Sequence, residues 1–145
     1  MGYTTTFENG FTFNKPVTFD LYRRITEFAQ ERHEPRDGFP GYWCQWVIGK
    51  DYDGEEALVW DKGEKFYNYV EWLEYLIENF FKPEGYILNG NVGFQGESSD
   101  DFGTIEVVDN VVTQHFGIHV IDLSEIETEN LVKELNRRGY SVSPN

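Results

Sequence analysis

Three carboxylates recur at helical spacing in the middle of the chain. Glu71, Glu74 and Glu78 lie three and four residues apart, so a helix would place them in one line on its surface. Carboxylates this close together can act as a catalytic pair across a cleft, but like charges at this spacing are more typical of a solvated stripe. The spacing therefore indicates an acidic helix face rather than a catalytic pair.

Aromatic side chains accompany these acids. Seven aromatic residues fall between positions 66 and 81, and one helix face needs only some of them for a core. On a helix, Tyr67 would lie beside the acids, and Trp72 and Tyr75 would lie on the next stripe. Exposed Trp and Tyr beside carboxylates are typical of a protein-binding surface. The alternative is a wide sheet that covers more than one face of the helix and buries these rings.

A second acidic group lies in the segment GKDYDGEE. Its acids are the densest run in the chain: Asp51, Asp53, Glu55 and Glu56. A calcium-binding loop of the helix–loop–helix type needs helices on either side, whereas the flanking residues here are typical of strands. The run predicts a solvated hairpin turn, with weak divalent binding as the alternative. We add these four acids to the candidate partner-binding surface.

The cysteine and histidine residues form no pattern that supports catalysis. Cys44 would share a strand face with apolar neighbours, which raise a thiol pKa, so we expect a buried structural cysteine. As the single cysteine, it also excludes an internal disulfide and a multi-cysteine zinc site. His115 and His119 are four residues apart, and in a strand that spans roughly 13 Å, too far for one metal ion. We assign no catalytic residue, no metal site and no cofactor.

A different interpretation places a small ligand on the predicted sheet. Trp43, Gln45 and Asn89 would supply an aromatic face for stacking and two amides for hydrogen bonds, which suits a nucleotide or a sugar. The acidic field of the chain works against a phosphate group. A small-ligand binding protein or enzyme is therefore the alternative to a partner-binding surface.

The net charge of −14 is concentrated in one part of the chain. Residues 1–50 carry equal numbers of acids and bases, whereas residues 51–130 carry nineteen acids against three lysines. Such a field repels nucleic acid and anionic membranes and attracts basic partners, although solubility alone would also explain it. Since no apolar run approaches the ~20 residues of a membrane span and no secretory signal is visible, we expect a cytoplasmic protein.

The hydrophobic pattern predicts one α+β domain over residues 1–145, with a core at about 2–116 and a helical extension at about 122–140. We expect a mainly antiparallel, twisted sheet of about five to six strands, with a helix at 64–81 packed on one face and two further helices. The strands are expected at 3–13, interrupted at Asn9-Gly10, and at 42–48, 57–60, 86–95, 102–108 and 111–116.

Several local signals mark where these elements begin and end. Thr18 is a predicted N-cap for the first helix, and Ser124 with Glu127 matches a capping box for the last. Asn9-Gly10 predicts a tight turn or a bulge, and Asp109-Asn110 has the composition of a two-residue turn.

Five segments of the chain are long enough to be distinctive: GYTTTF, WCQW, GEKFYNYVEWLEYLI, KPEGYILNG and DDFGTIEVVDNVV. They resemble a group of small, uncharacterised acidic proteins found in bacteria, phages and prophages, and the resemblance covers roughly residues 2–116. It implies an origin in a mobile element. It carries no functional residue over to this chain.

These observations lead to one functional hypothesis and its alternative. The first is a non-enzymatic acidic binding protein, a phage or mobile-element accessory factor that blocks the basic, nucleic-acid-binding surface of a host defence protein. Its carboxylates would stand in place of phosphates, and the protein itself would bind neither nucleic acid nor membrane. The alternative is the small-ligand site described above. The sequence leaves the oligomeric state open.

Overall fold

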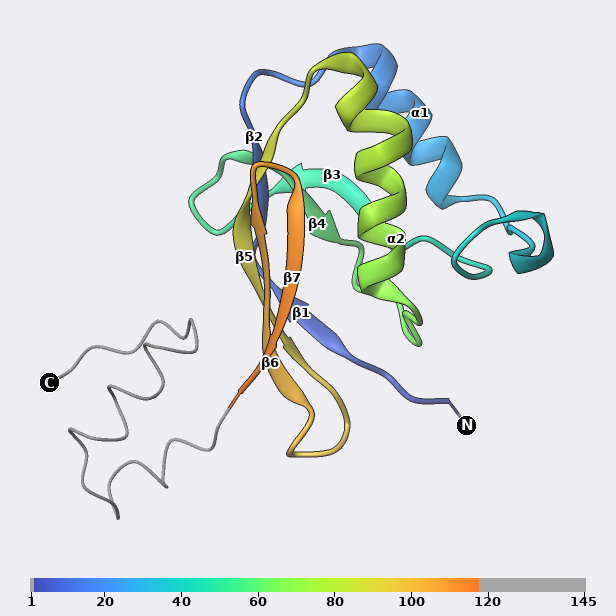
Figure 1. The fold of residues 1–145 in the computed structure, drawn as a ribbon, viewed down its shortest axis with the longest axis vertical. Coiled ribbons are helices and arrows are strands. Elements are labelled where there is room, and N and C mark those ends of the chain that lie inside the picture. The colour runs from blue at the N-terminus through green and yellow to red at the C-terminus, as the bar shows by residue number, and fades with distance from the viewer. Residues whose placement is uncertain (1, 118–145) are drawn as a thin grey trace, which may run out of the picture.

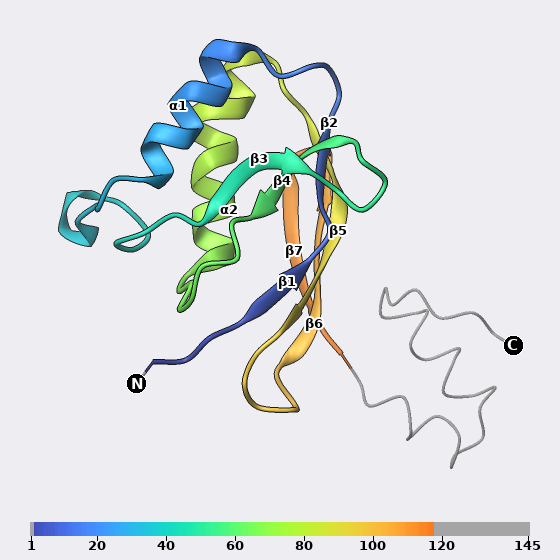
Figure 2. The same cartoon turned by 180° about the vertical axis from the view of Figure 1, so that it is seen from behind.

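The computed structural model describes residues 2–117, so the predicted helix at 122–140, its capping residues and His119 lie outside the described part of the chain. Within residues 2–117, the chain folds into one antiparallel sheet with two α-helices on one side of it (Figures 1 and 2). The predicted α+β class and the antiparallel sheet are confirmed. No helix of the described residues has the length and apolar character needed to cross a membrane.

The strands pair in the order β3-β4-β2-β5-β6-β7, and β1 pairs with β5. Their bounds are β1 Thr6–Glu8, β2 Gly10–Phe13, β3 Trp46–Lys50, β4 Glu56–Trp60, β5 Leu88–Gln95, β6 Phe102–Val108 and β7 Val111–Phe116. All ladders are antiparallel, as the short connections predict. The predicted meander at the end of the core is β5, β6 and β7.

The pair Asn9-Gly10 interrupts a strand and does not reverse it. Phe7 pairs with Phe94 and Phe11 pairs with Gly90, so β1 and β2 run in one direction along β5. Asn9 has a φ of 77°, which kinks the chain at this point. A side chain at Gly10 would stand 2.8 Å from the carbonyl oxygen of Leu58, so only glycine allows this close approach. Of the two predictions, the bulge describes the structure better than the turn.

Both α-helices cover the same face of the sheet and close one core. α1 (Phe19–Ala29) begins at Thr18, whose hydroxyl accepts a hydrogen bond from the Leu21 backbone at 3.1 Å, and this confirms the predicted N-cap. α2 (Tyr69–Leu76) lies beside α1 in both views (Figures 1 and 2). Leu73 of α2, Ile25 of α1 and Val92 of β5 are all buried in this core.

The predicted helix at 64–81 is wrong at its start. Lys62, Lys65 and Asn68 have left-handed backbone conformations, with φ of 69°, 60° and 57°, so the chain turns repeatedly before α2 begins at Tyr69. Phe66 is buried between these turns, with its ring 5.3 Å from that of Trp46. The chain before α2 therefore forms turns that bury this ring, where the sequence predicts the first turns of the helix. Hydrophobic periodicity alone does not reveal this.

At its other end, α2 passes into a π-helical turn at Ile77–Phe81 and then a 3₁₀ turn at Lys82–Glu84. The helical stretch ends at Gly85, whose φ of 81° is the left-handed conformation that glycine adopts at helix ends. A π turn adds a residue to one turn of the helix and rotates the side chains that follow it. Here Ile77 and Phe81 both remain buried.

The predicted strand at 42–48 begins only at Trp46. Cys44, Trp46 and Ile48 alternate along the chain and are buried, but Tyr42, at the preceding alternate position, is exposed, because the chain before Trp46 belongs to a loop. The two-residue turn at Asp109-Asn110 is confirmed: both residues have positive φ, 49° and 72°, as a tight hairpin between β6 and β7 requires.

Candidate functional site

The line of acids predicted on the helix lies on the solvent side of α2 and of the π turn. Glu71, Glu74 and Glu78 are all exposed. Lys82 pairs with Glu78 at 3.2 Å, but both side chains are mostly exposed, and such a pair contributes about 0.5 kcal/mol or less. The line therefore keeps a negative charge that faces outward.

Trp72 is not on the surface, so its assignment to a partner-binding surface is wrong. Its side chain is fully buried and packs against Phe28 of α1 and against Phe39 and His33 of the following loop. Tyr75 is half-buried and stacks on Phe28, with ring centroids 5.7 Å apart. The rings are covered by α1 and its following loop, and the wide sheet considered as an alternative is not what buries them.

A shallow groove runs between the acids of α2 and the hairpin of β6 and β7. It has a volume of about 270 Å³ and is lined by Glu74, Ile77, Glu78, Asn110, Val111 and Val112. Val111 is 65% exposed, whereas Ile77 is almost fully buried and forms part of the core. The groove thus joins an apolar surface to two carboxylates. We call it the acidic groove.

The turn that forms one wall of the acidic groove is firmly held. The Asn110 side chain accepts a hydrogen bond from the Leu88 backbone at 2.7 Å and donates one to the Tyr86 carbonyl at 3.0 Å. Gln114 of β7 donates to the Tyr69 hydroxyl at 3.3 Å and so links β7 to α2. Sequence reasoning missed this wall, although Val111-Val112 beside a tight turn signals that one of the two valines points outward.

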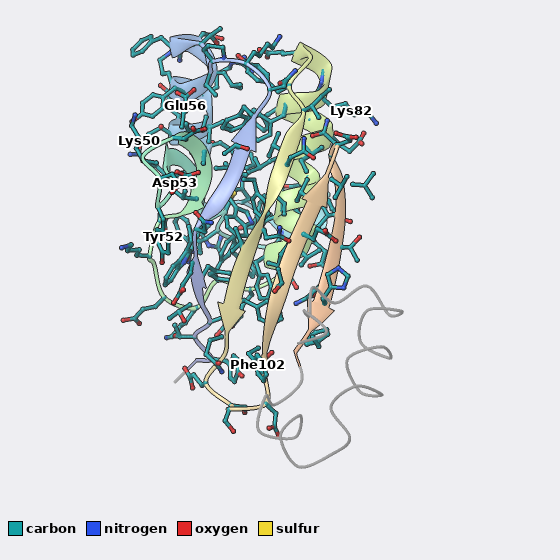
Figure 3. The ribbon with its side chains drawn as sticks, turned by 90° about the vertical axis from the view of Figure 1, so that its left-hand side faces the viewer. Lys50, Tyr52, Asp53, Glu56, Lys82 and Phe102 are labelled. Carbon is teal, nitrogen blue, oxygen red and sulfur yellow. The ribbon has the colours of Figure 1, made fainter. Side chains whose placement is uncertain are left out.

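The acids of the β3–β4 hairpin lie apart from the acidic groove. The hairpin tip projects on the side of the sheet away from the helices (Figures 1 and 2), and Figure 3 shows Tyr52, Asp53 and Glu56 at one edge of the molecule with Lys82 toward the other. The described acids therefore do not form one surface. The sequence leaves open whether the two acidic segments share one face, and the structure places them on separate parts of the described surface.

Two of the hairpin acids stabilise the fold. Asp51 accepts hydrogen bonds from the backbones of Asp53 and Glu55, both at 2.9 Å, and so holds the turn. Glu56 accepts one from the Val17 backbone, also at 2.9 Å. Asp53 and Glu55 are exposed. The segment is a solvated hairpin turn, as predicted.

The residues of the alternative ligand site are brought together only in part. Trp43 and Gln45 line one cleft, and Tyr67 joins them there from the loop before α2. Asn89 lies elsewhere, in β5, where its side chain accepts a hydrogen bond from the Asp109 backbone at 2.8 Å. Asn89 therefore supports the β6–β7 turn, and its assignment to the pocket is wrong.

The titratable groups of the described residues include a buried thiol and a histidine–carboxylate pair. Burial raises the pKa of the Cys44 thiol to about 12, so the thiol stays protonated, as expected for a structural cysteine. His115 lies 3.1 Å from Glu106, on β7 and β6. Among residues 2–117, no group of three or more His, Cys, Asp or Glu side chains is arranged to hold a metal ion.

Comparison with protein-family models, with curated proteins and with solved structures finds no match to this chain. The resemblance to small acidic proteins of bacteria and phages stays a prediction. The function has to be argued from the surface itself.

Proposed function

We propose that this chain is a non-enzymatic binding protein that docks a basic segment of a partner protein in the acidic groove. The observation that carries the proposal is the juxtaposition, in one groove, of Glu74 and Glu78 with the exposed Val111. A groove of about 270 Å³ is below the usual range for small-molecule pockets, about 300–1,000 Å³. Its size suits one or two side chains of a partner.

Lysine and arginine match both halves of this groove. Their methylene stems pack on apolar surface while the charged end stays in solvent or meets a carboxylate. Placed here, the stem would lie along the exposed Val111, and the charged end would reach Glu74 or Glu78. The net charge of −14 adds attraction at long range and so raises the rate of association.

The kind of partner follows from the same geometry. Glu71, Glu74 and Glu78 are exposed and lie three and four residues apart, so they present a line of carboxylates to a partner. The partner we propose is a protein whose lysines and arginines bind nucleic acid, because carboxylates compete with phosphates for these side chains. A host defence protein as that partner, and a mobile-element origin, rest on the resemblance alone.

Two triple variants test this function. The groove variant carries Glu71→Lys, Glu74→Lys and Glu78→Lys. The control variant carries Glu31→Lys, Asp53→Lys and Glu55→Lys, which are exposed acids away from the groove. Each reversal adds two charges, so both variants change the net charge from −14 to −8.

The assay is retention of basic proteins from a bacterial lysate at low and at high salt, followed by mass spectrometry. We expect the wild type and the control variant to retain the same basic nucleic-acid-binding protein at low salt. The groove variant should release it, and high salt should weaken the wild-type complex. Equal loss in both variants would show that bulk charge, and not the groove, attracts the partner. Tight retention that ignores salt and both variants would contradict the proposal.

A further inference from the structure

A second concave site lies on the loops around the start of α2, and it differs from the acidic groove in size and chemistry. It has a volume of about 450 Å³, inside the usual range for small-molecule sites. Its lining residues are Arg32, Tyr42, Trp43, Gln45, Glu64, Lys65 and Tyr67. We call it the aromatic cleft.

Three aromatic rings stand exposed in this cleft. Tyr42 and Trp43 are each 47% exposed, and Tyr67 is 50% exposed. By contrast, Trp46 and Trp72 are fully buried. Large rings that remain in solvent together, beside polar groups, mark a binding surface more often than isolated exposed residues do.

The loop that carries one wall of the cleft is held before any ligand arrives. Gln45 donates a hydrogen bond to the Glu64 carbonyl at 2.9 Å, and its oxygen accepts one from the Trp60 indole at 3.2 Å. The Tyr67 hydroxyl accepts a hydrogen bond from the Tyr3 backbone at 3.1 Å. Lys65 adopts a left-handed conformation that a lysine rarely takes, so the surrounding contacts impose it. Preorganised walls reduce the cost of ordering a site on binding.

The rim of the cleft carries both signs of charge. Arg32 lies over the Tyr42 ring, 4.5 Å from its centroid, and is already paired with Glu34. Lys65 offers donors and Glu64 offers acceptors on the same loop. A hydroxyl group donates and accepts at once, so a polyhydroxylated ligand satisfies both kinds of group. The C–H face of such a ring packs on an aromatic side chain.

We propose that the aromatic cleft binds a neutral sugar unit of an oligosaccharide, with its ring stacked on Trp43 or Tyr67 and its hydroxyls hydrogen-bonded to Lys65 and Glu64. A neutral ligand does not feel the field of a chain with a net charge of −14, whereas a nucleotide phosphate is repelled by it. Of the two cations that line the cleft, Arg32 is already paired with Glu34. This site is independent of the acidic groove.

The test is saturation-transfer NMR, which detects ligand protons that touch the protein. The probes are maltotetraose, cellotetraose and chitotetraose at millimolar concentration, with adenosine monophosphate as the competing class. At least one saccharide should bind saturably, with an affinity that salt does not change. Trp43→Ala and Tyr67→Ala should each weaken it about tenfold or more. Tyr52→Ala, which removes an exposed ring from the β3–β4 hairpin, is the matched control and should have no effect.

Two results would overturn the proposal. One is the absence of saturable transfer to all three saccharides, with circular dichroism showing the protein folded. The other is saturable binding of adenosine monophosphate that weakens with salt and with Lys65→Ala, which would assign the cleft to an anionic nucleotide.

Discussion

Two buried tryptophans, one with a hydrogen-bonded indole and one without, allow the contribution of the hydrogen bond to stability to be separated from that of packing. Trp46 and Trp72 are both fully buried. The Trp46 indole donates a hydrogen bond to the Tyr69 carbonyl at 2.8 Å. Among the described residues, no group accepts a hydrogen bond from the Trp72 indole. Substitution of each by phenylalanine removes the same atoms, so the difference between the two variants isolates the polar contribution.

The structure sets the expected magnitudes. Loss of part of a buried ring system costs about 2 kcal/mol in either case. Trp46→Phe also loses a hydrogen bond worth about 1 kcal/mol, for a total of about 3 kcal/mol. The buried Trp72 indole N–H lacks an acceptor among the described residues, which destabilises the wild-type protein by about 1–2 kcal/mol. Trp72→Phe removes this penalty, so the net loss of stability falls to about 0–1 kcal/mol. We therefore expect Trp46→Phe to be the more destabilising by about 2 kcal/mol.

Urea unfolding followed by far-ultraviolet circular dichroism measures this difference. With a typical dependence on urea of about 1–3 kcal/mol per molar, the two midpoints should differ by about 1 M. The control is Trp43→Phe at a half-exposed position, which should change stability by less than about 0.5 kcal/mol. Equal midpoints for the two buried positions, or a lower midpoint for Trp72→Phe, would refute the assignment of hydrogen bonds.

Three further predictions concern the loop on α2, the wall of the acidic groove and the buried thiol. Gly41→Ala places a β-carbon 3.1 Å from the Trp72 indole nitrogen, so we expect a loss of about 1–3 kcal/mol in the urea assay, and an unchanged midpoint would contradict this packing. Asn110→Ala removes two hydrogen bonds and leaves alanine at a φ of 72°; we expect a loss of about 2–4 kcal/mol by thermal unfolding, and a wild-type melting temperature would count against it. Burial raises the pKa of the Cys44 thiol from 9.0 to about 12. Between these two pH values the unfolded chain has lost the thiol proton while the folded chain still holds it, so the free energy of unfolding is highest below pH 9 and declines toward pH 12. The loss should be about 1.4 kcal/mol one pH unit above the ordinary thiol pKa, and Cys44→Val should lack it; parallel pH profiles of the two proteins would refute this.

Local patterns predicted much of the sheet because they depend on neighbours in the sequence. The alternation of Cys44, Trp46 and Ile48 marks an inward face, and a positive φ at Asp109 and Asn110 closes the hairpin that their residue types favour. The N-cap at Thr18 is equally local. Such features are visible in a single sequence because no distant contact decides them.

Features fixed by distant contacts were not predictable in the same way. The Trp72 ring has helical spacing that fits an exposed stripe, and only the packing of α1 and Phe39 against it makes it buried. The start of α2 depends on where Phe66 enters the core. The aromatic cleft unites Trp43 with Tyr67, which were assigned to two different hypotheses because they lie on separate segments.

The most direct test of the central claim, that the acidic groove docks a basic segment, is an NMR titration of isotope-labelled protein with a synthetic amphipathic peptide of lysine and leucine. We predict saturable amide shifts confined to Glu71–Glu78 and to Asn110–Val112, which weaken as salt is added. Shifts centred on the hairpin acids at 51–56, or no saturable shift in the groove at low salt, would contradict the claim.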